Sequence, residues 1–152
     1  MARTPLEVVQ AVLADPTNEV AVTSMVAPDA TYVALNFDNP ALKKIMPWAG
    51  TSTGPQAVLD AFTSVGRFWN REAFEIRTTL EDGAKVALFG SLTLRSKTLG
   101  KAATTPIAIL AEVHDGRVTY MQFMEDTFGT TGTFRTGAAT FHSDPDGGPV
   151  SL

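Results

Sequence analysis

The chain has 152 residues, a formal net charge of -4, and 18% charged against 44% hydrophobic residues. This length suits one domain with its own core, and the composition is that of a globular protein rather than a disordered one. The acidic balance offers no basic surface for a nucleic acid, and the lack of cysteine excludes disulfides, a thiol nucleophile and thiolate metal sites.

Neither a signal peptide nor a membrane partner is expected from the sequence. The opening residues MARTPLE contain no long apolar stretch, and no segment reaches the roughly 20 apolar residues that a membrane helix needs. The absence of cysteine fits a reducing compartment. We therefore expect a cytoplasmic protein.

The first part of the chain carries the patterns of three helices. Thr4 and Glu7 have the spacing of a capping box, with Pro5 at the first helical position, and Asp15 precedes a proline that ends this helix. Two further helices are expected over residues 17–25 and 55–68.

The rest of the chain indicates a sheet. Residues 30–36 are strand-like, whereas 37–54 have no clean period and predict a structured loop that carries Trp48. Four more strands are expected, over 74–80, 85–95, 103–114 and 117–126. Helices followed by a meander predict an α+β domain over 1–128, with a partly flexible C-terminal extension over 129–152.

The dipeptide Asp115-Gly116 predicts a tight hairpin, because both residues tolerate the positive φ of a type I′ turn. A two-residue loop pairs His114 with Arg117 and, further along, Leu110 with Met121. Alternation then predicts one face formed by Ala108, Leu110, Met121, Phe123 and Glu125, and an opposite face formed by Ile107, Ile109, Tyr120, Gln122, Met124 and Asp126. Both faces are largely apolar, so we expect the helices to cover the first and a second subunit of a homodimer to cover the other.

The order of these segments resembles the nuclear transport factor 2-like superfamily, in particular its SnoaL-like and ketosteroid isomerase-like members. The resemblance rests on LEVVQAVLA, MVAPDATYVALN, PWAGTSTGPQAVLDAF, DGAKVALFGSLTL and AEVHDGRVTYMQFMEDT. It implies a cone of three N-terminal helices packed on a strongly bent mixed or antiparallel sheet, with a ligand pocket between them and dimerisation through the outer sheet face.

The catalytic groups of the steroid-isomerising branch are missing from the matching positions. The resemblance places Val12 where that branch has its tyrosine, Ala34 at its base and Ala108 at its protonated acid. Methyl groups cannot form an oxyanion hole, so we do not expect efficient steroid isomerisation. Phe123 stands where cyclase-like and epoxide hydrolase-like branches place an acid.

Two carboxylates remain as candidate catalytic residues, Glu125 and Asp126. Glu125 is expected on the pocket face, where burial would raise its pKa toward that of a general acid or base, unless it lies at a solvated rim. Asp126 either takes part in the same site or has a structural role as a hydrogen-bond acceptor. Asn36, two residues beyond Ala34, is the nearest polar group able to polarise a carbonyl.

The expected ligand is a small apolar or carbonyl-containing molecule. The residues predicted to bind it are Tyr32, Asn36, Trp48, Phe62, Phe89, Ala108, Leu110, Met121 and Phe123. No cofactor or metal site is predicted, because the two histidines lack ligand spacing. The sequence predicts cofactor-free proton transfer, cyclisation or hydration, or else a non-catalytic ligand-binding or dimeric interaction module.

Overall fold

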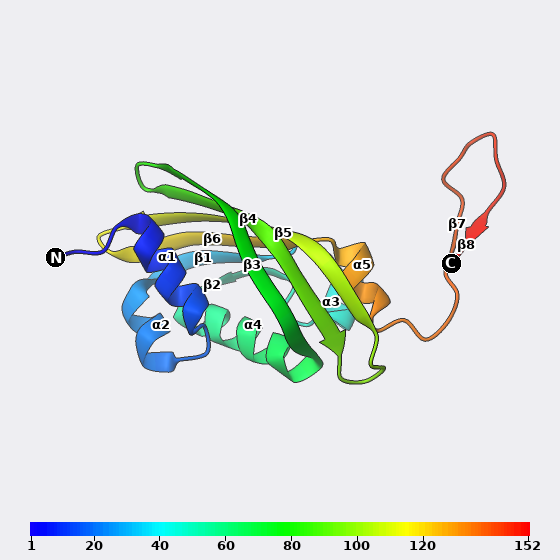
Figure 1. Cartoon of the computed structure of the whole chain (residues 1–152), viewed down its shortest axis with the longest axis horizontal. Helices are drawn as coiled ribbons and strands as arrows, with labels where there is room; N and C mark the ends of the chain where they lie inside the picture. Colours follow the sequence, from blue (N-terminus) through cyan, green and yellow to red (C-terminus); the bar gives the residue numbers. More distant parts are fainter.

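The computed structural model describes residues 1–152 as a layer of helices on the concave face of a strongly curved, six-stranded sheet (Figure 1). The strand order is β2-β1-β6-β5-β4-β3, in which only β1 and β6 run parallel. The α+β class and the bent mixed sheet predicted from the sequence are confirmed. No helix is long and apolar enough to cross a membrane.

The three predicted helices are α1 (Pro5–Ala14), α2 (Glu19–Met25) and α4 (Pro55–Phe68). The capping box at α1 is formed as expected, because Glu7 N donates to Thr4 Oγ1 at 3.2 Å and Thr4 N donates to Glu7 Oε2 at 2.8 Å. These helices bury apolar side chains against the concave face, which creates the core and one wall of a cavity.

The predicted loop over 37–54 contains a short helix, α3 (Pro40–Ile45), and an edge strand, β2 (Gly50–Thr53). Asn39 Oδ1 caps α3 by accepting from Leu42 N at 3.0 Å. Six residues are too few to display a helical period, and the polar strand GTST shows no apolar alternation. The sequence pattern therefore missed both elements.

The five long strands are β1 (Val26–Ala34), β3 (Trp69–Asp82), β4 (Lys85–Ser96), β5 (Ala102–His114) and β6 (Arg117–Glu125). The chain then forms α5 (Thr127–Gly132) and a small hairpin of β7 (Thr140–Phe141) and β8 (Val150–Ser151). This hairpin lies beyond α5 at the C-terminal end of the chain (Figure 1), and the ring of Phe141 in β7 lies 5.9 Å from that of Phe128 in α5.

The predicted register of β5 and β6 is wrong by one residue beyond the turn. Asp115 and Gly116 have the positive φ values of 52° and 74° that the turn needs, and His114 faces Arg117 as predicted. A β-bulge then inserts Thr119, since Val113 pairs with Val118 and Glu112 with Tyr120. From there on, β5 presents the opposite set of side chains to that predicted.

The bulge reverses the predicted faces of β5. Ile107 and Ile109, expected on the outer face, are buried in the core, and Ala108 and Leu110 lie on the outer face instead. Phe89, which pairs with Ala108, is also outside and 45% exposed. The assignment of Phe89, Ala108 and Leu110 to the pocket was therefore wrong.

Candidate active site

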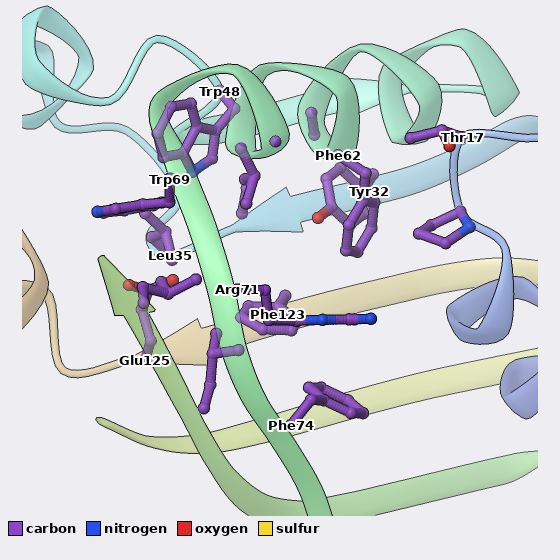
Figure 2. A pocket seen from close by; sticks show the side chains of 17 residues that line it. Thr17, Tyr32, Leu35, Trp48, Phe62, Trp69, Arg71, Phe74, Phe123 and Glu125 are labelled. Carbon is purple, nitrogen blue, oxygen red and sulfur yellow. The ribbon is translucent and has the colours of Figure 1, made fainter. Parts of the chain in front are cut away.

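A cavity of about 250 Å³ lies between α4 and the concave face of the sheet, and most of its lining is apolar (Figure 2). Of the residues predicted to bind the substrate or act on it, five line this cavity: Tyr32, Trp48, Phe62, Phe123 and Glu125. Met121 is buried in the core but does not line the cavity, and Asn36 is absent from its wall.

Glu125 is the last residue of β6 and the carboxylate of the cavity wall. Its Oε2 atom is buried and has no hydrogen-bond partner. Burial raises the pKa of Glu125 from its ordinary value of 4.5 to about 7, with a smaller increase from the neighbouring charge of Asp126. The Thr130 hydroxyl lowers the pKa of Glu125 and so opposes part of this increase. Its proton is donated to the Asp126 carbonyl oxygen at 3.2 Å, which leaves Glu125 Oε2 without a partner.

Tyr32 supplies a phenol to the same cavity. It lies on β1, beside β6 in the parallel pair, and its ring packs 6.4 Å from that of Phe62. Burial, with a further contribution from the charge of Glu125, raises the pKa of Tyr32 above its usual range. The hydroxyl therefore stays protonated and can donate a hydrogen bond to a ligand oxygen.

Asp126, the second predicted catalytic acid, does not line the cavity. It is the N-cap of α5, where its Oδ1 accepts from Gly129 N at 3.2 Å. Its own N–H donates to Thr105 Oγ1 at 2.8 Å. These contacts correspond to the structural alternative considered for this residue.

The chain turns sharply at Leu35, which redirects Asn36 away from the predicted position. Leu35 has a φ of 71°, and Asn36 N donates to Ala34 O at 2.8 Å, as in a γ-turn. Consequently Ala34 and Leu35, although adjacent, both line the cavity. Asn36 Oδ1 is buried without a partner outside the cavity wall. No residue pattern signals this turn, because a leucine with positive φ is uncommon.

An aromatic cluster closes the cavity near Trp48. The Trp48 ring lies edge-on to that of Trp69 at 5.2 Å, and Trp69 stacks on Phe134 at 4.9 Å. Trp69 Nε1 donates to Thr133 Oγ1 at 2.9 Å. The start of the C-terminal extension thus packs against the cavity wall and holds Trp69 in place.

Sequence reasoning also missed Arg71, Phe74 and Thr17 in the cavity wall. The sequence does contain a signal for Arg71 and Phe74. Within one regular strand, large apolar residues on the same face are an even number of positions apart, but Trp69 is an odd number of positions from Phe74 and Ile76. This spacing indicates a bulge between Trp69 and Phe74. Thr17 lies in the α1–α2 connection, and nothing in the local sequence distinguishes it from an ordinary loop residue.

The arrangement combines a carboxyl that titrates near neutral pH with a neutral phenol inside an apolar chamber. Such a pair suits removal of a proton by one group while the other stabilises negative charge on an oxygen atom. No three His, Cys, Asp or Glu side chains come together as a possible metal site.

Two curated fungal proteins are similar to the chain in sequence. Patulin synthesis protein F of Aspergillus clavatus is 50% identical over 129 residues, which span 82% of this chain and 65% of that protein, just under two thirds of its length. Patulin biosynthesis cluster protein F of Penicillium expansum is 43% identical over 154 residues, which span 96% of this chain and 77% of that protein. No family model matches the sequence.

Solved structures share the fold at low sequence identity. An NTF2-like protein from Burkholderia thailandensis has a TM-score of 0.74 at 20% identity, covering 88% of this chain and 99% of that one. TerC, co-crystallised with polyporic acid, has a TM-score of 0.69 at 21% identity, covering 86% and 98%. A putative SnoaL-like polyketide cyclase from Mesorhizobium loti has a TM-score of 0.60 at 17% identity, covering 80% and 98%. The resemblance to these folds, predicted from the sequence, is confirmed.

Proposed function

Because the chain belongs to the family of patulin biosynthesis cluster protein F and has an NTF2-like fold, we propose that it is an enzyme of small-molecule biosynthesis. In this proposal it moves a proton on a small carbonyl-containing molecule without a cofactor. The relatives' names place them in the synthesis of a small molecule, patulin, which supports a biosynthetic role for this chain.

The observation that carries the proposal is the unpartnered Oε2 of Glu125 in the wall of an apolar cavity. A buried carboxyl without a partner is costly, and such groups gather at functional sites. With a pKa of about 7, Glu125 is present in both protonation states near neutral pH. It can therefore accept a proton and return it, as a general acid–base catalyst must.

The proposed reaction begins when the Glu125 carboxylate removes a proton from a carbon next to a carbonyl. The electron pair of that C–H bond forms a carbon–carbon double bond, and the π pair of the carbonyl moves onto its oxygen. The resulting enolate oxygen accepts a hydrogen bond from the Tyr32 hydroxyl. Glu125 then returns the proton to another atom of the same molecule. The product is an isomer of the substrate, so no oxidant or reductant is consumed.

A neutral probe, 5-nitrobenzisoxazole, tests the base directly. A carboxylate removes its ring C–H proton, the N–O bond opens, and a coloured cyanophenolate forms. We expect the wild-type protein to accelerate this opening, and Glu125→Gln to lower the rate by a factor on the order of 100 or more. The matched control is Asp126→Asn, which keeps the N-cap of α5 and should stay within a few-fold of wild type.

The probe also separates the enzyme from the competing hypothesis of a non-catalytic binding module. A probe that binds in the cavity but opens equally fast with wild type and Glu125→Gln would refute the proposed base. Binding would then be the remaining activity of the cavity.

We also propose a homodimer formed through the outer sheet face. Phe89, Leu110 and Met124 lie on three neighbouring strands and are 45%, 43% and 46% exposed. Large apolar side chains gathered in this way are typical of a contact surface. The sequence predicted Ile107 and Ile109 in this contact, but they are buried in the core, so the proposed contact uses Ala108 and Leu110 instead.

A further inference from the structure

Arg71 brings a positive charge to the cavity from β3. It lines the cavity and remains exposed, so it lies where the cavity meets solvent. Figure 2 shows its guanidinium group pointing to one side of the cavity, whereas Glu125 lies on the other. The two groups can therefore contact different parts of one ligand.

A β-bulge accounts for the inward direction of Arg71. Arg71 pairs with Leu94, and Phe74 pairs with Leu92, while the register shifts between them. Simple alternation would put side chains three residues apart on opposite faces, but the bulge puts Arg71 and Phe74 on the same one. The guanidinium carbon lies 5.5 Å from the centre of the Phe74 ring, which holds the guanidinium beside the cavity.

The acids closest in sequence to Arg71 are engaged elsewhere. Glu72 forms an ion pair with Arg95, and Glu75 forms one with Arg77 at 3.3 Å. Arg71 takes part in none of the protein's ion pairs. The pKa of Glu125 is governed by burial, Thr130 and Asp126, not by Arg71, in keeping with their separation. The guanidinium donors thus remain free for a ligand.

We propose that Arg71 forms a subsite for a planar oxyanion of the ligand, a carboxylate or an enolate. A guanidinium group presents a planar fork of N–H donors that matches two oxygens sharing one negative charge. This inference rests on the proposed function, because the subsite orients a substrate whose other end reaches Glu125 and Tyr32. It narrows the substrate class to molecules that carry an acidic oxygen group beside their apolar body.

Two pairs of probes test this subsite and distinguish the sources of the charge. Cinnamate and cinnamamide differ in a carboxylate, while 2-hydroxy-1,4-naphthoquinone and 1,4-naphthoquinone differ in an ionised enol. Binding is measured by calorimetry at low salt, with wild type, Arg71→Gln and Arg77→Gln. The Arg77 variant is the matched control, since this exposed arginine on the same strand already pairs with Glu75.

We expect wild type to bind at least one anion about 10-fold more tightly than its neutral partner, with the better pair identifying the source of the charge. Arg71→Gln should lose this preference and Arg77→Gln should keep it, and added salt should weaken it. Three results would overturn the subsite. Wild type could bind both members of each pair equally well, or bind none of the four probes. Arg71→Gln could also keep the preference for the anion.

The opening of 5-nitrobenzisoxazole separates this result from the proposed function, because that probe is neutral and needs no oxyanion subsite. Arg77→Gln, whose arginine lies outside the cavity wall, should open it at nearly the wild-type rate. A protein that prefers anions through Arg71 but does not open the probe would retain the subsite and lose the proposed base.

Discussion

Replacing Glu125 by Gln should change how the stability of the protein depends on pH. The carboxyl has a pKa of about 7 in the folded protein and an ordinary value of 4.5, so the folded state binds this proton more tightly. Between these values the unfolded chain has released the proton and the folded protein has not. The free energy of unfolding therefore falls as the pH rises from 4.5 and levels off above about 7.

The size of the effect follows from the two pKa values. The difference between 4.5 and about 7 corresponds to an upper limit of about 3 kcal/mol in the free energy of unfolding. Gln has a similar shape and does not ionise, so the free energy of unfolding of Glu125→Gln should not show this decrease with rising pH. The variant should match wild type below the lower value and be more stable by up to about 3 kcal/mol above the upper one.

Urea unfolding at a series of pH values measures this difference, with tryptophan fluorescence as the signal because Trp48 and Trp69 both line the cavity. Asp126→Asn is the control, since it removes a neighbouring charge while keeping the N-cap. It should retain most of the pH dependence. If the curves of wild type and Glu125→Gln stay parallel across the whole range, Glu125 is not desolvated and the reasoning fails.

Three further predictions address the phenol, the outer face and the sheet. Tyr32→Phe should fold normally and open 5-nitrobenzisoxazole about 10-fold more slowly, because it removes the donor to the developing oxyanion; an unchanged rate would exclude that role. Leu110→Asp should convert the proposed dimer to a monomer in light scattering without unfolding it, and a wild-type mass equal to a monomer would contradict the dimer. Gly90→Ala should be strongly destabilising in thermal unfolding, because the added Cβ would lie 1.8 Å from the Glu75 carbonyl oxygen. Gly66→Ala should be tolerated, since a Cβ there would meet nothing within 4 Å. Similar melting temperatures for the two variants would contradict this difference.

The helices could be predicted because their signals are local. The capping box at Thr4 and Glu7 and the apolar spacing of α4 each depend on residues within one helix. The edge strand β2 could not be predicted, because it is stabilised by contacts from elsewhere in the chain, and the helix α3 is too short to display a helical period. Val33 of β1, for example, pairs with Thr51 of β2, and Thr51 N donates to Phe37 O at 3.1 Å.

The tight turn was predictable, but the register beyond it was not. Asp115 and Gly116 specify the turn through their own backbone preferences. The bulge at Thr119 lies three residues beyond the turn and depends on how both strands bend around the core. One inserted residue was enough to turn Leu110 from an expected pocket residue into an outer-face residue.

The side of the sheet on which Glu125 lies was nevertheless predicted correctly, and the reason is physical. Met121, Phe123 and Glu125 alternate within β6 itself, so they share a face whatever the pairing with β5. Their partner Tyr32 joins them through long-range parallel pairing, in which it lies opposite Met121, and no local pattern reveals that pairing. The proposed base can thus be read from one strand, whereas the phenol that would support it and the arginine that would orient the ligand depend on how distant strands pair and bulge.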